Sequence, residues 1–325
     1  MKKFSNYFLT FIIIVFAFAL LLFSSSNIVA VRSAIELCLD SIFPSLFPFL
    51  IVSELLSYTS LIPFLSAKFE RIMRPLFKVP GIGSYPFILG FISGYPVGAK
   101  IVSNLRSNNK ISKIDGERLL VFTNNAGPLF IIGSIGFSMY LNSTIGFLIL
   151  GVNIFSSIIT GIIFSHFYKF DYRNSYSSLV ESELNFSSLG EIISSCIKKA
   201  FYTLSTVCGF IIIFSLIISM INSSGILSFI HNQWIEYTIL GLLEITNGIK
   251  LISSIPFNNL LPHLVITAFL IGTSGFSVLL QVWSIISKTD LSIKPYFIGK
   301  LLNGIISATV MFAFLTIFPI FQFSI

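Results

Sequence analysis

Residues 88–103, ILGFISGYPVGAKIVS, and residues 239–253, ILGLLEITNGIKLIS, align across one gap. Both begin with Ile-Leu-Gly, contain Gly-x-Lys and end with Ser, so the chain carries an internal repeat. Each copy is followed by an apolar stretch that glycines interrupt: residues 119–136, LLVFTNNAGPLFIIGSIG, and residues 266–284, ITAFLIGTSGFSVLLQVWS. Paired hydrophobic segments that break at corresponding places in two halves are typical of secondary transporters.

The composition around these repeats is that of a membrane protein. Hydrophobic residues make up 54% of the 325 residues and charged residues 10%, whereas a soluble domain has about 25% charged residues. The mean hydropathy is +0.92. Since a spanning helix needs about 20 apolar residues, the sequence predicts an all-α polytopic protein. The net charge of +7 lies mostly in short loops between apolar stretches, which indicates topology and not a nucleic-acid partner.

Loop charges give the topology of the first part of the chain. Lys2 and Lys3 predict a cytoplasmic N-terminus. The apolar run after them also fits a signal peptide, although an uncleaved first helix is favoured in a polytopic chain. Residues 24–31 hold no basic residue and are expected outside, and a span over residues 35–58 then leads inward to a basic, amphipathic segment at residues 68–78.

The first repeat copy has basic segments on both sides, which predicts a re-entrant hairpin. If residues 85–105 crossed the membrane, the basic segment at residues 106–118 would lie outside, against the charge rule. Gly94 and Gly98 permit unusual backbone angles and Pro96 breaks a helix, so SGYPVG is the expected tip. The chain is then expected to cross outward over residues 119–140 and to return over residues 145–168.

The second copy has no basic residue beside it and is expected to enter from the outside. Residues 198–222 are predicted to cross outward, and the hairpin covers residues 238–255. Residues 263–287 then cross inward to a loop with Lys288, Lys294 and Lys300, and residues 301–321 form the last span. The result is an inverted repeat with two re-entrant hairpins and two broken transmembrane helices, whose breaks imply a shared central site.

The predicted organisation follows from this topology. The expected parts are N-terminal helices with the amphipathic cytoplasmic segment (1–84), a first gate repeat (85–168), a polar cytoplasmic linker (169–190) and a second, inverted gate repeat (191–325).

The hairpin tips are the first candidates for a substrate site. At each tip one half-helix ends and another begins, and the N–H groups of the new half-helix favour an anion. A kinked and tightly packed pair of helices is the alternative. The candidate tip residues are Ser93, Gly94, Tyr95, Pro96 and Gly98 in the first copy and Glu244, Thr246 and Asn247 in the second.

Lys100 and Lys250 occupy equivalent positions just after the tip glycines. A lysine at the centre of a bilayer costs about 2.5–3.5 kcal/mol on insertion scales. Two symmetric lysines therefore predict a substrate with two negative charges. Snorkelling of the lysines to the membrane surface is the alternative.

Polar residues also interrupt the two crossing helices. Asn124 and Asn125 lie in the first break and Thr273 and Ser274 in the second, where they either bind ligand or join helices. Glu244 is the candidate to carry a coupling proton or Na⁺, or else to pair with Lys250.

Other classes of function find no support in the sequence. There is no H-E-x-x-H, G-x-S-x-G or Walker motif, so no enzyme is predicted. The three cysteines form no C-x-x-C pair and the three histidines lie far apart, so no metal site and no cofactor other than the coupling ion is expected.

Four strings of residues resemble one known family. CLDSIFPSLFPFLIVSELL (38–56), GFISGYPVGAKIV (90–102), FTNNAGPLFIIGSIG (122–136) and GLLEITNGIK (241–250) are similar to the sporulation integral membrane protein YlbJ family. That family carries gate-type domains resembling concentrative nucleoside transporters. The resemblance covers most of the chain and places the tip residues and the two asparagines in gate motifs.

The resemblance implies transport of dipicolinic acid during sporulation. It implies a protein of the cell membrane or the outer forespore membrane, with a small anionic substrate, the lipid bilayer as its surroundings and no nucleic acid. Related transporters assemble as dimers or trimers, which implies a homo-oligomer. Dipicolinate carries two carboxylates and agrees with the paired lysines. A nucleoside transporter and a membrane scaffold for spore envelope assembly are the alternatives.

Overall fold

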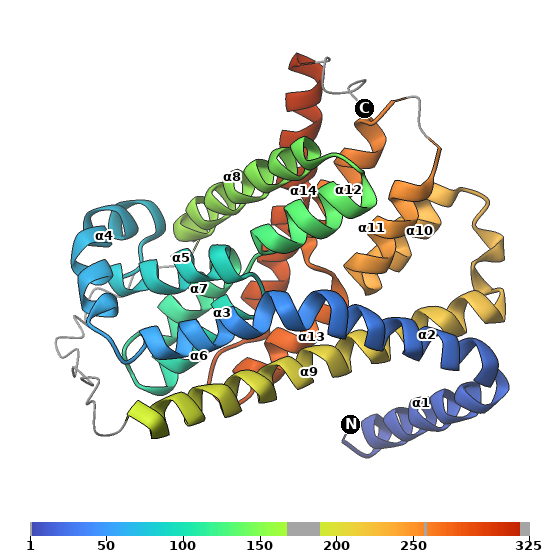
Figure 1. The fold of residues 1–325 in the computed structure, drawn as a ribbon, viewed down its shortest axis with the longest axis horizontal. Coiled ribbons are helices and arrows are strands. Elements are labelled where there is room, and N and C mark those ends of the chain that lie inside the picture. Colours follow the sequence, from blue (N-terminus) through green and yellow to red (C-terminus); the bar gives the residue numbers. More distant parts are fainter. Residues whose placement is uncertain (1, 168–188, 257–258, 319–325) are drawn as a thin grey trace.

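The computed structural model describes residues 2–167, 189–256 and 259–318, and every regular element in these ranges is a helix (Figure 1). The predicted linker at residues 169–190 lies almost wholly outside the described residues. The all-α class predicted from composition is confirmed.

The N-terminal part is a bent helix pair followed by a long continuous helix. Helix α1 (Lys2–Leu22) meets α2 (Ser24–Leu37) at 96°. Helix α2 continues through a π-helical segment, η1 (Cys38–Ile42), into α3 (Phe43–Leu56). Residues 24–31, which are expected outside between two spans, are helical and form the first turns of α2. These residues contain no proline or glycine to end a helix, so the helix runs on.

Helix α4 (Leu61–Phe77) turns away from α3 by 87°. It buries Ile62, Leu65 and Met73 and leaves Phe64 exposed beside its basic residues. This arrangement agrees with the amphipathic segment predicted from the sequence.

Hairpin 1 is formed by α5 (Ser84–Ser93) and α6 (Val97–Ser107), after a short 3₁₀ turn, η2 (Gly81–Gly83). Helix α7 (Lys113–Thr123), which a Ser112–Asp115 capping box starts, follows it. The chain is then irregular over residues 124–127 and resumes as the π-helix η3 (Leu129–Met139) and α8 (Ser143–Phe167).

Hairpin 2 repeats this order. Helix α9 (Leu189–Ser224) and the 3₁₀ turn η5 (Ile226–Phe229) lead to the hairpin helices α10 (Gln233–Leu243) and α11 (Ile245–Ser254). The helices that follow are α12 (Leu261–Thr273), α13 (Gly275–Ile286) and α14 (Ile293–Ile317). In both hairpins the glycine after the tip lies against backbone. Gly98 packs on the carbonyl of Thr123, and Gly248 packs on the Cα of Gly241.

The start of α14 corrects the predicted last span. Ser292 caps the helix by accepting a hydrogen bond from the Lys294 backbone N–H at 3.3 Å, so the helix begins before Lys300 and not after it. The expectation that Lys300 lies in a cytoplasmic loop is therefore wrong. The lysine is 2% exposed inside the helix bundle.

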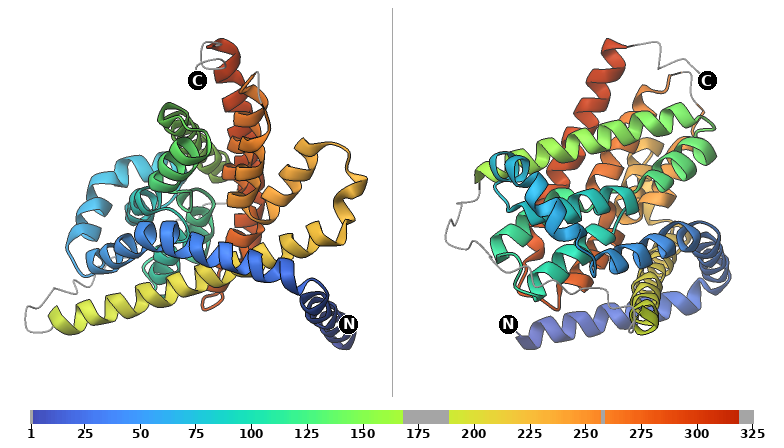
Figure 2. Two further views of the ribbon diagram at one scale, coloured as in Figure 1. Left: turned by 45° about the vertical axis from the view of Figure 1, so that its right-hand side comes forward. Right: turned by 60° about the vertical axis from the view of Figure 1, so that its left-hand side comes forward.

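The arrangement in space is that of the predicted inverted repeat. Helices α2, α3 and α9 lie side by side, hairpin 1 lies towards one end of the molecule and hairpin 2 towards the other (Figure 1). Helix α1 extends from the rest, and α8 packs across α14 (Figure 2).

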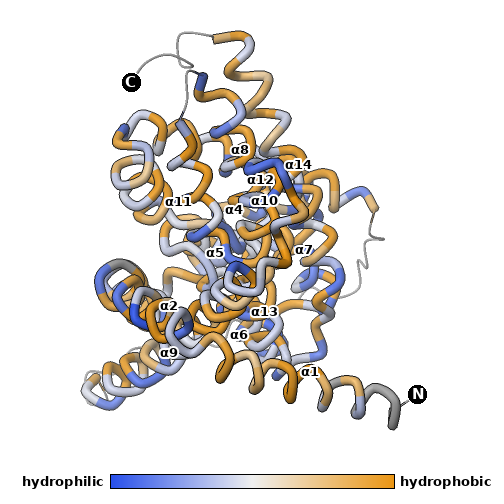
Figure 3. Tube along the Cα trace, turned by 90° about the vertical axis from the view of Figure 1, so that its right-hand side faces the viewer, coloured by the Kyte–Doolittle hydropathy of each residue, from blue (hydrophilic) through white to orange (hydrophobic). Residues whose placement is uncertain are grey.

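Several helices are long and apolar enough to cross a bilayer, with hydrophobic residues along most of their length (Figure 3). In the described part of the chain four helical spans meet this test: Ser143–Phe167, Leu189–Ser224, Leu261–Ile286 and Ile293–Ile317. The number rises to six if the bent helix pairs at residues 10–40 and 46–77 each count as one span.

Candidate functional site

The two hairpin tips and the two helix breaks meet in the interior. Hairpin 1 reverses at Gly94, where φ is +83°, a backbone angle that favours glycine. A Cβ atom on Gly94 would lie 2.7 Å from the backbone nitrogen of Gly127, so the first tip rests against the break after α7. A Cβ atom on Gly275 would lie 2.9 Å from the Ile245 side chain, so the second tip rests against the break after α12.

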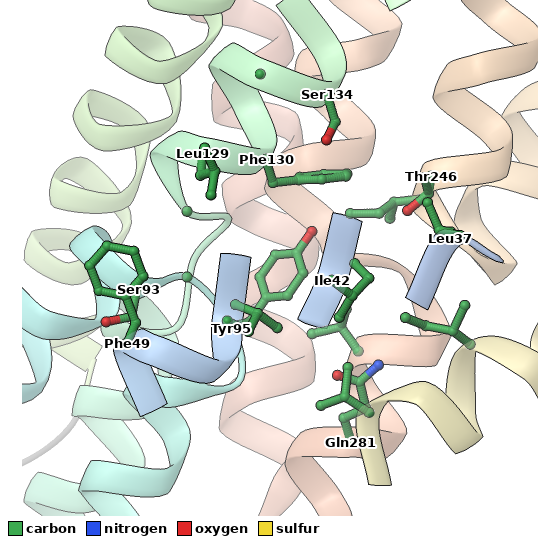
Figure 4. Close-up of a pocket in the computed structure, with 18 of the residues that line it drawn as sticks. Leu37, Ile42, Phe49, Ser93, Tyr95, Leu129, Phe130, Ser134, Thr246 and Gln281 are labelled. Atoms are coloured by element: carbon green, nitrogen blue, oxygen red, sulfur yellow. The ribbon is translucent and has the colours of Figure 1, made fainter. Parts of the chain in front are cut away.

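A cavity of about 290 Å³ lies between these parts. It is bounded by both tips, by η3 and α13, and by the stretch from α2 to α3 together with α9. Tyr95, Phe130, Thr246 and Gln281 surround the same space (Figure 4). We call it the tip cavity. Its polar lining residues are Asp40, Ser93, Tyr95, Ser134, Glu244, Thr246, Ser277 and Gln281.

The ionisable groups that line the tip cavity are acidic. Asp40 and Glu244 line it, and among the described residues no lysine or arginine does. Two π-helical segments, η1 and η3, also contribute to the lining. Such segments shift the direction of side chains and occur often at functional sites.

Glu244 is the buried acid of the second tip, with 3% of its surface exposed. Its carboxylate accepts hydrogen bonds from the backbone N–H groups of Thr246 at 3.1 Å and Asn247 at 2.8 Å, and so caps α11. The amide of Asn247 donates to Ser215 on α9 at 3.5 Å. Because Glu244 already occupies these N–H groups, a second anion has to displace it to bind there.

Asn124 caps the other hairpin from a neighbouring element. Its Oδ1 accepts a hydrogen bond from the Ala99 backbone N–H at 3.3 Å, near the start of α6. Its Nδ2 donates to the hydroxyl of Tyr296 on α14 at 3.0 Å. Asn124 therefore joins the first break, hairpin 1 and α14.

Asn125 is the centre of a second buried network, which contains Lys300. Its Oδ1 accepts hydrogen bonds from Lys300 Nζ at 2.9 Å and from the Ser157 hydroxyl at 2.7 Å. Its Nδ2 donates to the Phe122 carbonyl at 2.7 Å. Asn303 extends the polar region, because it accepts from Thr160 at 3.1 Å and donates to the Gly272 carbonyl at 3.1 Å.

Lys300 and Asn303 did not appear among the residues singled out from the sequence. A signal for them exists in Ser292-Ile-Lys-Pro295, because serine at an N-cap and proline in the first turn mark a helix start. Starting the last helix there places both residues inside α14, where they are buried.

The two equivalent lysines lie in different surroundings. Lys100 Nζ forms an ion pair with Glu54 Oε1 at 2.8 Å, outside the tip cavity. Glu54 is itself buried, with 4% of its surface exposed. Lys250 is exposed on α11, and within the described part of the chain it does not lie within ion-pair distance of Glu244.

The tip cavity brings together part of the predicted site. Five of the predicted residues line it: Ser93, Gly94, Tyr95, Glu244 and Thr246. Three others are buried close by without lining it, namely Asn124, Asn125 and Ser274. Thr273 lines a smaller apolar cavity with Lys300. Pro96 and Gly98 shape the start of α6.

Comparison with known proteins gives two similarities. Residues 39–167 match the protein-family model Gate, described as nucleoside recognition. The chain is 33% identical over 307 residues to the sporulation integral membrane protein YlbJ of Bacillus subtilis (strain 168), and this similarity covers 86% of the chain and 75% of the relative. No solved structure matches the chain.

Proposed function

Because this chain belongs to the family of the sporulation integral membrane protein YlbJ, we propose that it is a membrane transporter that binds its cargo in the tip cavity. The two hairpins reach this cavity from opposite ends of the molecule. Opening of one hairpin at a time exposes the bound cargo to one side of the membrane and then to the other.

The observation that carries this proposal is the meeting of both tips and both helix breaks around one cavity. Irregular backbone at membrane depth is tolerated only where protein or a water-filled cavity surrounds it. A bundle with a purely structural role has no need for the same break in both repeats.

The acidic lining of the tip cavity affects which cargo can bind there. Dipicolinic acid is the cargo expected from the family resemblance, but a bare dianion is repelled by Asp40 and Glu244. We therefore propose that it is carried together with protons or Na⁺, with Glu244 as the coupling group. A neutral nucleoside needs no such compensation, and the hydroxyl and amide lining favours it as the second candidate.

The test is uptake by proteoliposomes of labelled dipicolinate and, in parallel, of labelled uridine. We expect uptake of one of them that depends on a proton or Na⁺ gradient and is lost in Glu244→Gln. Glu236→Gln, on the same hairpin but outside the tip cavity, is the matched control and should keep its uptake. Correctly folded protein that moves neither compound contradicts the proposed cargo classes and favours the scaffold alternative.

A further inference from the structure

A second cavity, of about 240 Å³, lies between α3, α6 and α9 on the side of the loop that joins α6 to α7. Its lining is polar and basic, unlike that of the tip cavity. We call it the lysine cavity. Its lining residues that carry charge, amide or phenol groups are Glu54, Tyr58, Tyr85, Lys100, Asn104, Asn108, Lys110 and Lys199.

One carboxylate is already held between two of these lysines. Glu54 Oε1 lies 2.8 Å from Lys100 Nζ, and Glu54 Oε2 lies 3.5 Å from Lys199 Nζ. The Glu54 side chain is 5% exposed, Lys100 13% and Lys199 49%. The geometry is therefore that of a carboxylate site which the protein fills with its own side chain.

The positive charge in the lysine cavity exceeds what Glu54 balances. Lys110 lines the same cavity, so three lysines face one glutamate. Charges in a partly enclosed cavity interact more strongly than on an open surface, because less water screens them. The surplus favours a ligand with two negative charges.

Aromatic and amide groups complete the walls of the lysine cavity. The hydroxyl of Tyr85 donates to the Ser53 carbonyl at 2.7 Å, which fixes its ring in the wall. Tyr58 lies with its ring centroid 6.0 Å from Lys199 Nζ. Asn104 and Asn108 add amide groups that can donate to carboxylate oxygens.

We propose that the lysine cavity binds a small dicarboxylate, and that one ligand carboxylate takes the place of Glu54 beside Lys100 and Lys199. This inference rests on the proposed transport function and gives the anionic cargo a first binding site outside the acidic tip cavity. Lys100 belongs to hairpin 1 and Glu54 to α3, so binding also breaks an ion pair that connects the hairpin with its neighbour.

The test is equilibrium binding of labelled dipicolinate to the full-length protein in nanodiscs. Lys100→Met removes an attractive charge and should weaken binding about tenfold. Glu54→Gln removes the internal competitor and should tighten it. A merely structural ion pair predicts the same direction for both variants, since either change breaks the pair. Equal loss of binding in both therefore overturns the proposal.

Three comparisons make the result specific. Lys198→Met removes an exposed lysine next to Lys199 and should leave binding unchanged. Picolinate, with one carboxylate, should bind the wild type about tenfold more weakly than dipicolinate, and equal affinity contradicts a site for two carboxylates. Thermal unfolding of each variant shows whether it is folded.

The binding assay also separates this inference from the proposed function. Dipicolinate binding that depends on Lys100 supports the lysine cavity even if proteoliposomes take up nothing, in which case transport fails alone. Uptake of dipicolinate that is lost in Glu244→Gln but unaffected in Lys100→Met keeps the transporter and overturns the lysine cavity.

Discussion

Glu244 has two roles at the residue scale, because its carboxylate both caps α11 and lines the tip cavity. Glu244→Ala should destabilise the protein by about 1 kcal/mol, the typical cost of losing a side-chain N-cap. The measurement is chemical or thermal unfolding in detergent. An unchanged free energy of unfolding would contradict the capping role, whatever the variant does to uptake.

Removing the charge of Lys300 should stabilise the protein, whereas removing the Glu244 side chain should destabilise it. No aspartate or glutamate lies within ion-pair distance of it in the described part of the chain, and a buried charge without a partner is costly. In Lys300→Met, Asn125 Oδ1 still accepts from Ser157. We expect Lys300→Met to unfold at a higher temperature than the wild type. A lower melting temperature would show that the lysine stabilises the bundle through Asn125.

The equivalent lysines provide a residue-scale test of the paired-lysine hypothesis. Lys250→Met changes an exposed side chain, whereas Lys100→Met leaves Glu54 with only Lys199 at 3.5 Å. We expect the Lys100 variant to lose dipicolinate uptake and the Lys250 variant to keep most of it. Equal loss in both would favour two lysines at one site, as the repeat suggested.

At the scale of the element, each hairpin depends on a glycine that lets backbones touch. A Cβ atom on Gly248 would collide with the Cα of Gly241. Gly248→Ala should therefore force α10 and α11 apart and cost about 1–3 kcal/mol. The control is Gly209→Ala in α9, where no atom lies within 4 Å of the added Cβ. That change should be neutral or stabilising, since alanine favours helix.

These elements also show what the sequence could and could not predict. The repeat was found from the shared Ile-Leu-Gly and Gly-x-Lys, and the hairpins were predicted from the loop charges beside each copy together with the glycines and proline of the first tip. The repeat could be found because its glycines are the ones that pack closely in the structure. The loop charges indicate where spans end but not whether a helix continues between them, so they did not reveal that α2 runs through η1 into α3. The π-helical segment η1 also contains no proline or glycine that would mark it in the sequence. Loop charge also misplaced Lys300, since it counts a buried lysine as a loop residue.

At the scale of the whole molecule, the two repeats are tied together where their loops meet. Arg106, at the end of hairpin 1, donates to both carboxylate oxygens of Asp290, between α13 and α14, at 2.8 and 3.1 Å. The Ser103 hydroxyl donates to the Ile285 carbonyl nearby at 3.3 Å. These contacts connect segments far apart in the sequence.

The Arg106–Asp290 pair predicts a dependence of stability on pH. The hydrogen bond from Arg106 lowers the pKa of Asp290 below its ordinary value. Its contribution is therefore fully present above that ordinary value and is lost as the pH falls through the lowered pKa. Since about half of the Asp290 side chain is exposed to solvent, water screens the pair and the effect is small. Asp290→Asn should unfold with a weaker dependence on pH between 5 and 3 than the wild type, and identical profiles would contradict this.

Hairpin 1 rests on α7 through both backbone and side chains: Gly90 and Gly98 pack on the carbonyl of Thr123, and the Phe87 ring lies 5.8 Å from the Phe122 ring. At the two glycines the helices cannot slide past each other without a shift of the backbone. Hairpin 1 and α7 therefore count mechanically as one rigid part. The molecule has fewer independent moving parts than it has helices, and a change of access at this end then requires that block to move against the helices on which it packs, chiefly α8, α13 and α14.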